Sequence, residues 1–252
     1  MPVRDRFEIA KIALRAILSQ DEKPHEIVIV DDGSVTPFEV QIDYLKTEAA
    51  ASGITLKVSR HENSKGVSAA RNRGFADSSG DLICFCDSDD YWMPSKLETV
   101  KRLLRSAPDT KVLFHSFFWN GGTLPIFGYL PAKKMIKLSK SLLVAFGFLN
   151  PSCFSILRSS YGLGFREDLR HYEDLEYFLR LSKKTDIWFY NDALTEMGRM
   201  PGSEGGASGD AQAMRRGAAI ALEQYVGFSL VGFLAVSKIL YHKMRYFLNR
   251  FA

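Results

Sequence analysis

The sequence predicts an α/β fold: a mostly parallel central sheet with helices on both faces, followed by a helical tail. Short apolar or β-branched runs alternate with longer segments of helical periodicity, and turn residues separate the two kinds of segment. The length of 252 residues and the apolar content of 46% suit one large α/β domain or two small ones. Because ligands of such sheets bind at the carboxyl ends of the strands, functional residues are expected there.

The first half of the chain alternates regularly. Apolar residues recur at helical spacing from Phe7 to Ile17 and predict a helix, and residues 26–30 predict a buried strand. Pro94 is expected just inside the last helix of this half, which ends near Arg105. Between them the sequence predicts helices over residues 38–51 and 66–76 and strands over residues 54–59 and 82–86.

The second half is less regular. The sequence predicts strands over 112–116 and 153–157, a helix over 139–146 and a loop rich in glycine, proline and aromatic residues over 119–131. Another helix is expected to begin at His171–Asp174. Acidic residues in a first helical turn are often explained by the helix dipole alone.

Acidic residues follow two of the predicted strands. Asp87, Ser88, Asp89 and Asp90 come directly after residues 82–86. Crowded carboxylates repel one another at the end of a buried strand, so a divalent cation or a basic ligand is expected to neutralise them. A second pair, Asp31 and Asp32, ends the strand at 26–30 and is expected to face the same crevice.

Four motifs in this order resemble glycosyltransferase family 2, a group of inverting, nucleotide-sugar-dependent enzymes with the GT-A fold. The resemblance extends from about Pro2 to Ser208, and each motif alone would be weak. The motifs are EIVIVDDGS (26–34), GVSAARNRG (66–74), DLICFCDSDDYW (81–92) and GFREDLRHYEDLEYFLRL (164–181).

The resemblance implies how a nucleotide-sugar donor binds. Asp87, Ser88 and Asp89 match the D-x-D motif, in which a divalent cation, Mn or Mg, grips the donor diphosphate. Hard carboxylate oxygens suit such a cation, which stabilises the charge of the leaving group. The remaining donor-side residues are Asp31 near the uracil and ribose, Asp32 and Arg71 in the nucleotide pocket, and Asp90 and Trp92 as secondary candidates.

The same resemblance implies an inverting transfer to an acceptor hydroxyl. Inversion requires a nucleophile on the opposite face of the sugar, and a positioned carboxylate that removes its proton contributes about 10²- to 10⁴-fold. Asp174, in the E-D pair with Glu173, matches the catalytic base. The expected acceptor is a saccharide or a lipid-linked sugar in cell-surface polysaccharide or glycolipid synthesis.

Several of these residues also have simpler interpretations. Asp31 and Asp32 precede Gly33 and suit a turn, Arg71 suits an ion pair on a helix surface, and Trp92 suits packing. Asp87 and Asp89 have partial EF-hand spacing, but Trp92 lies where that loop requires glycine. A nucleotidyltransferase is a further alternative, although the glycine-rich basic loop expected after its first strand is missing.

Two departures from the family pattern limit the resemblance. Residues 1–5 match only the end of the family's first segment, so the first central strand is expected to be lacking. A histidine found in many relatives before the serine-rich loop is replaced here by Met200 and Pro201 after Arg199. The alternative function is therefore a truncated, non-catalytic relative that binds nucleotide sugar or docks in a membrane assembly complex.

The expected organisation is a catalytic domain over 1–210, with a donor half of about 1–116 and an acceptor half of about 117–210, and a tail over 211–252. The tail's apolar run at 225–240 is shorter than the roughly 20 residues of a spanning helix, and basic residues follow it. The tail is expected to be a peripheral membrane helix or a helix packed on protein.

The modest net charge of +4 does not indicate nucleic-acid binding. The protein is expected to be cytoplasmic and peripheral on the cytoplasmic face of the membrane.

Overall fold

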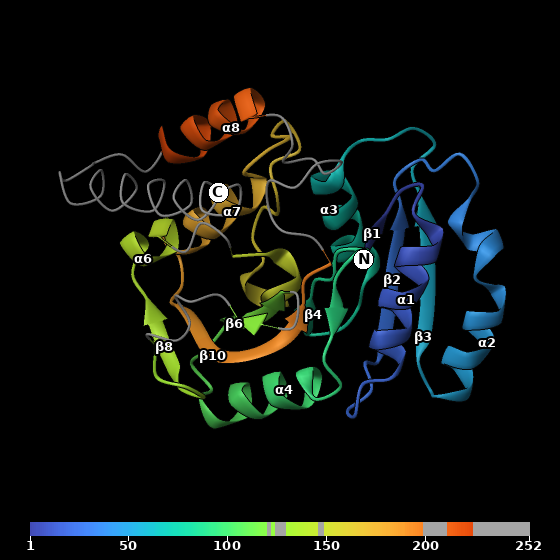
Figure 1. The fold of residues 1–252 in the computed structure, drawn as a ribbon, viewed down its shortest axis with the longest axis horizontal. Helices are drawn as coiled ribbons and strands as arrows, with labels where there is room; N and C mark the ends of the chain where they lie inside the picture. Colours follow the sequence, from blue (N-terminus) through green and yellow to red (C-terminus); the bar gives the residue numbers. More distant parts are fainter. Residues whose placement is uncertain (120–121, 124–129, 146–148, 199–210, 224–252) are drawn as a thin grey trace, which may run out of the picture.

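The computed structural model describes residues 1–119, 122–123, 130–145, 149–198 and 211–223, and it confirms the α/β class (Figure 1). The strands form two sheets that lie side by side, with helices packed against them. Three of the segments named above lie outside the described residues: most of the loop at 119–131, the serine-rich loop that follows Pro201, and the tail beyond 223.

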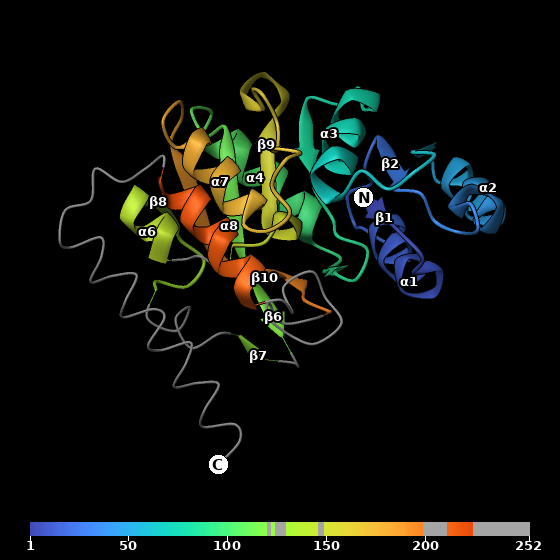
Figure 2. The ribbon, with the colours of Figure 1, turned by 90° about the horizontal axis from the view of Figure 1, so that it is seen from above.

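The first sheet is entirely parallel and has the strand order β1-β2-β3. Its strands are β1 (Pro2–Val3), β2 (Glu26–Asp31) and β3 (Thr55–Arg60), and its helices are α1 (Phe7–Leu18), α2 (Asp43–Ala51) and α3 (Val67–Asp77). Figure 2 shows α1 and α3 on opposite sides of this sheet. A short 3₁₀ turn over Phe38–Gln41 precedes α2, so the helix expected over 38–51 is broken at Ile42.

The second sheet has seven strands and mixes both orientations. The parallel pair is β6 with β10, whereas the other neighbours are antiparallel. Its main path runs β4 (Leu82–Cys84), β9 (Phe154–Leu157), β6 (Val112–Trp119), β10 (Ile187–Glu196) and β5 (Tyr91–Trp92), with β7 (Gly122–Thr123) on β6 and β8 (Met135–Leu138) on β10.

Aromatic side chains fill the core of the second sheet. Phe114 and Phe154 are fully buried, and the ring centroids of Phe114 and Phe178 lie 4.6 Å apart in an edge-to-face contact. Phe178 belongs to α7, whose first turn carries the acidic residues Glu173, Asp174 and Glu176. The helices of this half are α4 (Lys96–Ser106), α6 (Lys140–Ala145), α7 (Glu173–Leu181) and α8 (Ala211–Glu223).

The first strand, β1, has two residues. Pro2 pairs with Val30 and Val3 with Asp31, so β1 covers only the carboxyl end of β2. The first strand was expected to be lacking, and the structure has it as this short pairing. Across the described residues, no helix is both long and apolar enough to span a membrane.

Candidate functional site

One buried arginine joins three of the sequence motifs. Arg71 of α3 donates from Nη2 to both carboxylate oxygens of Asp87, at 2.8 and 2.9 Å, and from Nη1 to Glu173 Oε1 at 3.1 Å. Only 5% of Arg71 is exposed. Burial alone would lower its pKa, but the charges of Asp87 and Glu173 raise the pKa above its usual value. Carboxylates from two other motifs thus meet at a single guanidinium.

The acidic loop after β4 is anchored to the second sheet. Ser152 Oγ accepts a 2.8 Å hydrogen bond from the backbone N–H of Asp87, and Gly198 N–H donates to Asp90 Oδ1 at 3.1 Å. Beneath the loop, the fully buried Lys96 donates to the carbonyl oxygen of Ser152 and to Thr195 Oγ1. These contacts hold the backbone of the loop while leaving the carboxylates of Asp87 and Asp89 at its surface.

The two carboxylates of the D-x-D motif remain partly accessible. The side chains of Asp87 and Asp89 are each 21% exposed, and Arg6 Nη1 lies 3.2 Å from Asp89 Oδ2. Among the described residues no group of three or more His, Cys, Asp or Glu side chains is arranged to hold a metal ion. A cation bound here would keep water or phosphate oxygens for its remaining positions, as Mg²⁺ usually does.

Asp174 lies in the first turn of α7, directly after Tyr172, whose backbone is left-handed with φ 58°. Its Oδ1 accepts a 2.7 Å hydrogen bond from the Leu175 N–H. Burial and the neighbouring charge of Glu173 raise the pKa of Asp174 to about 7. A carboxyl group with a pKa near neutral can accept a proton during catalysis, which the helix dipole alone would not provide.

Asp31 ends β2 with its carboxylate directed into its own loop. It accepts hydrogen bonds from Ser34 N–H at 2.8 Å, from Phe38 N–H at 3.0 Å and from Arg60. Burial would raise the pKa of Asp31, but these hydrogen bonds outweigh it and lower the pKa. With only 1% of the residue exposed, this carboxylate shapes the turn after β2.

Asp32 has the same character and organises the start of α3. Its carboxylate accepts from Ser64 Oγ at 2.7 Å, from Lys65 N–H at 2.9 Å and from Gly66 N–H at 2.9 Å, and it lies 2.7 Å from His61 Nδ1. Burial opposes ionisation, yet these partners lower the pKa of Asp32 to about 2. The simpler interpretation of this pair as turn residues thus describes their contacts correctly.

The remaining candidates are buried. Ser88 and Asp90 lie under the loop surface, and burial followed by the charge of Asp87 raises the pKa of Asp90 to about 7. Trp92 belongs to the core, with Lys96 Nζ 3.9 Å from its ring centroid. Within the described part of the chain its Nε1 has no hydrogen-bond partner. Packing, the simpler interpretation, therefore accounts for the position of Trp92.

Sequence reasoning missed the residues that hold the acids in place. Arg60 ends β3 and His61 follows it, so the rule that directs attention to strand ends could have identified them. Arg6, Lys96 and Ser152 carry no signal of that kind, because their partners lie far away in the sequence.

Comparisons with known proteins agree with this fold. The sequence profile described as "Glycosyl transferase family 2" matches residues 1–164, which include every donor-side candidate but neither Glu173 nor Asp174. An amylovoran biosynthesis glycosyltransferase of Erwinia amylovora, AmsB, is 24% identical over 73% of this chain and 62% of its own length. A putative colanic acid biosynthesis glycosyl transferase of Escherichia coli, WcaA, is 31% identical over 38% of this chain and 33% of its own length.

Solved structures share the fold at low sequence identity. TarS of S. aureus, in complex with UDP-GlcNAc, has a TM-score of 0.70 at 20% identity and covers 95% of this chain and 70% of its own. The mannosyltransferase PcManGT of Pyrobaculum calidifontis, in complex with GDP-Man and Mn²⁺, has a TM-score of 0.66 at 13% identity and covers 95% and 71%. With its profile match over residues 1–164, the chain belongs to glycosyl transferase family 2.

Proposed function

We propose that the protein is a metal-dependent, inverting glycosyltransferase that moves a sugar from a UDP-sugar to a hydroxyl group of a saccharide or lipid-linked acceptor. The observation that carries this proposal is the contact of Arg71 with both Asp87 and Glu173. Through it, a donor-side carboxylate and the acidic pair that includes the expected base lie at opposite ends of one guanidinium. The donor half is about 1–116 and the acceptor half about 117–210.

The relatives support the reaction class and the process. AmsB and WcaA are named for amylovoran and colanic acid biosynthesis, so cell-surface polysaccharide synthesis is the process we infer. TarS is described with UDP and UDP-GlcNAc, and PcManGT with a guanosine diphosphate sugar. We choose uridine over guanosine because the resemblance assigns Asp31 to the uracil and ribose region; Asp32 and Ser88 remain donor-binding candidates.

In this mechanism the residues of the chain have separate tasks. A divalent cation, Mn or Mg, held by Asp87 and Asp89 would stabilise negative charge on the leaving diphosphate. Arg71 fixes Asp87 and keeps the local charge balanced. Since Asp174 Oδ1 is engaged by the Leu175 N–H, Oδ2 is the atom that takes the proton of the acceptor hydroxyl.

The test is nucleotide release from a panel of UDP- and GDP-sugars with Mn²⁺. We expect release from a UDP-sugar, and loss of both release and Mn²⁺ dependence in Asp89→Asn, because an amide binds the cation more weakly than a carboxylate. Asp168→Asn is the matched control, since Asp168 is an exposed acid whose partner is Arg166. If no donor is bound or hydrolysed, or if Asp89→Asn behaves like the control, the proposal fails.

The short β1 favours a second candidate, a non-catalytic relative that binds nucleotide sugar. Calorimetry together with the release assay separates the two: a non-catalytic relative binds the UDP-sugar without releasing nucleotide, whereas the transferase does both.

We also propose that the tail contacts the cytoplasmic face of the membrane. Co-sedimentation of the protein with anionic vesicles tests this, and failure to sediment would contradict it.

A further inference from the structure

The last acid of the loop after β4 has no task in the proposed mechanism. Asp90 is only 2% exposed, whereas the side chains of Asp87 and Asp89 are each 21% exposed. A carboxylate that is covered to this extent does not face a ligand. Burying it is costly, so its position calls for an explanation within the protein.

Asp90 connects two parts of the second sheet that lie on either side of the acidic loop. At the end of β10, the Gly198 N–H donates to Asp90 Oδ1 at 3.1 Å. In the 3₁₀ turn over Pro151–Cys153, the fully buried Ser152 donates its hydroxyl to the same carboxylate. Ser152 Oγ also accepts the N–H of Asp87 at 2.8 Å. The buried acid therefore holds the loop from inside.

The register of β5 with β10 explains why Gly198 reaches this carboxylate. Tyr91 pairs with Glu196 in an antiparallel ladder. Continued by two residues in each chain, the same register puts Gly198 opposite Asp89. The ladder ends at this point, and the Gly198 N–H bonds to the side chain of Asp90 where a further strand residue would offer its carbonyl. Asp90 thus extends the pairing of β10 up to Asp89.

Glycine is required at position 198 by the backbone of Asp89. A Cβ atom on Gly198 would overlap the Asp89 carbonyl oxygen and lie 2.8 Å from the carbonyl carbon. Gly198 is exposed, and its φ is not positive, so neither burial nor backbone conformation excludes a side chain there. The close approach of the two backbones is the reason that remains.

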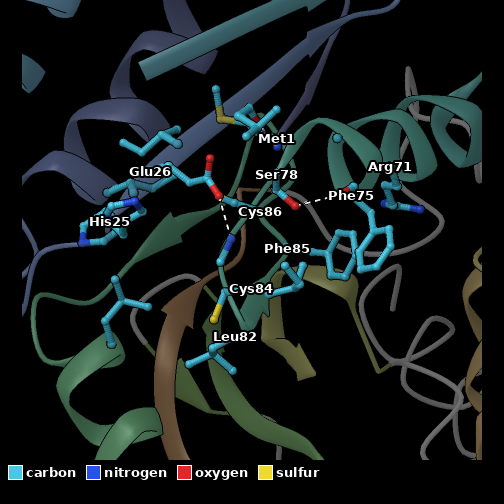
Figure 3. Close-up of a pocket in the computed structure, with 18 of the residues that line it drawn as sticks. Met1, His25, Glu26, Arg71, Phe75, Ser78, Leu82, Cys84, Phe85 and Cys86 are labelled. Atoms are coloured by element: carbon cyan, nitrogen blue, oxygen red, sulfur yellow. Dashed lines mark hydrogen bonds between the residues drawn. The ribbon is translucent and has the colours of Figure 1, made fainter. Parts of the chain in front are cut away.

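The opposite side of the loop gives weaker support. The residue that leads into the loop, Cys86, lines a cavity of about 280 Å³ between β2 and β4 (Figure 3). Its Sγ lies 3.4 Å from the Asp87 carbonyl oxygen and 3.6 Å from that of Asp90. A thiol is a weak donor, so the bonds of Asp90 to Gly198 and Ser152 are the stronger anchor.

We propose that Asp90 and Gly198 are positioning residues for Asp89. Asp90 ties the end of β10 to the acidic loop, and Gly198 admits the carbonyl of Asp89 where a side chain would displace it. Together they fix the backbone of Asp89 and hence the direction of its carboxylate toward a cation. The inference rests on the proposed function, because it concerns cation binding by Asp89. Altering groups that orient metal ligands typically costs roughly 10- to 100-fold in metal affinity.

The first test is Gly198→Ala in the full chain. Electron paramagnetic resonance of free Mn²⁺, with UDP present, measures the Kd for Mn²⁺ directly and needs no turnover. We expect this Kd to rise about tenfold or more, with a Tm close to that of the control. The matched control is Gly80→Ala, because a Cβ there approaches other atoms no closer than 3.8 Å. That variant should bind Mn²⁺ like the unaltered protein.

The second test compares Asp90→Asn with Asp90→Ala. Both variants lack the charge, but only Asn keeps an oxygen that can accept the Gly198 N–H. The Kd for Mn²⁺ should be higher in Asp90→Ala, and amide exchange at Gly198 should be at least about tenfold faster than in Asp90→Asn. Exchange at Met93 is the internal control, because its N–H donates to the Leu194 carbonyl at 3.0 Å and should be equal in both. If Asp90→Ala does not fold, Gly198→Ala decides alone.

Two results would overturn the inference and leave the proposed function intact. One is a Kd for Mn²⁺ in Gly198→Ala equal to that of Gly80→Ala. The other is an equal Kd and equal Gly198 exchange in the two Asp90 variants. If the unaltered protein binds no Mn²⁺, the proposed function fails, and exchange at Gly198 then decides whether Asp90 anchors the loop.

Discussion

The carboxylates at the end of β2, Asp31 and Asp32, and those after β4, Asp87 and Asp89, have different kinds of hydrogen-bond and ion-pair partners. Asp31 and Asp32 each accept several hydrogen bonds from backbone N–H groups and a small hydroxyl, in addition to their contacts with Arg60 and His61. The contacts described for the carboxylates of Asp87 and Asp89 are with the guanidinium groups of Arg71 and Arg6, without a set of backbone N–H donors around them. The first arrangement fixes a backbone, whereas the second leaves carboxylates whose partners can be exchanged for a ligand.

We count Asp174 with the second region, because its neighbour Glu173 and Asp87 share Arg71, and the two regions also differ in the direction of their pKa shifts. Hydrogen bonds lower the pKa of Asp32 to about 2, whereas burial and neighbouring carboxylates raise the pKa of Asp90 and Asp174 to about 7. Acids with raised pKa values cost stability at neutral pH, and such costs concentrate at functional sites. The comparison therefore favours the second region as the place where the chemistry occurs.

The largest effect is expected from Asp174→Asn. If the second region carries the chemistry, removal of the base should slow nucleotide release with acceptor present by about 10²- to 10⁴-fold, with little change in Tm. Asp32→Asn should instead lower Tm and reduce activity only as far as it unfolds the protein. Comparable losses of activity in the two variants, at equal folded fractions, would remove the functional distinction between the regions.

Arg71→Met should lower the free energy of unfolding by roughly 3 to 5 kcal/mol, because it leaves Asp87 and Glu173 without their shared buried partner. Urea denaturation measures this loss. Arg73→Met is the control on the same helix: its half-exposed side chain pairs with Asp77, and the expected change is about 0 to 1 kcal/mol. Equal effects at the two positions would contradict a central role for Arg71.

Opposite pH profiles should follow from Asp32→Asn and Asp90→Asn. Because the folded-state pKa of Asp32 is about 2, its stabilisation is present above pH 4 and is lost as the pH falls toward 2. Asn there should cost on the order of 2 kcal/mol at pH 7 and progressively less below pH 4.

For Asp90 the sign reverses. Its raised pKa of about 7 means that the folded state binds more protons than the unfolded state between about pH 4 and 7, so stability falls across this window as the pH rises. Asp90→Asn should therefore gain on the order of 2 kcal/mol at pH 8 and little at pH 4. Urea melts at several pH values test both variants, and parallel profiles would refute the opposite shifts.

The smallest effect is expected from Arg60→Met. Asp31 keeps the N–H groups of Ser34 and Phe38 as donors, so the loss should be roughly 1 kcal/mol. Arg60→Lys should recover part of it. A loss in urea melts as large as that of Arg71→Met would show that the two regions depend equally on their arginines.

Most of the first half of the fold could be predicted from the sequence. The strand at 26–30 is β-branched and uninterrupted, and β2 adds only Asp31. In contrast, β10 was missed, because Asn191 and Asp192 interrupt its apolar run. The structure accommodates them where the pairing with β6 shifts register between Tyr190 and Ala193. Such an irregularity depends on tertiary contacts and has no periodic signal.

The candidate site was predictable as residues but not as contacts. Asp87, Arg71 and Glu173 each stood out in a motif, yet their shared ion pairs depend on how α3 packs between the sheets. Lys96 shows the limit most clearly. In a sequence it resembles a surface lysine near the start of an amphipathic helix, but it is fully buried over Trp92 and bonded to Ser152.

The parallel pairing of β6 with β10 has a consequence for how the protein folds. Val112 pairs with Ile187, so the central strands of the second sheet meet only after a long stretch of intervening chain has been made. Every pair in the first sheet closes a shorter loop. Non-local pairing slows folding, and synthesis proceeds from the N-terminus. The first sheet can therefore assemble on the ribosome before β10 has been synthesised. During that interval β6 has an unpaired edge that can pair with other chains.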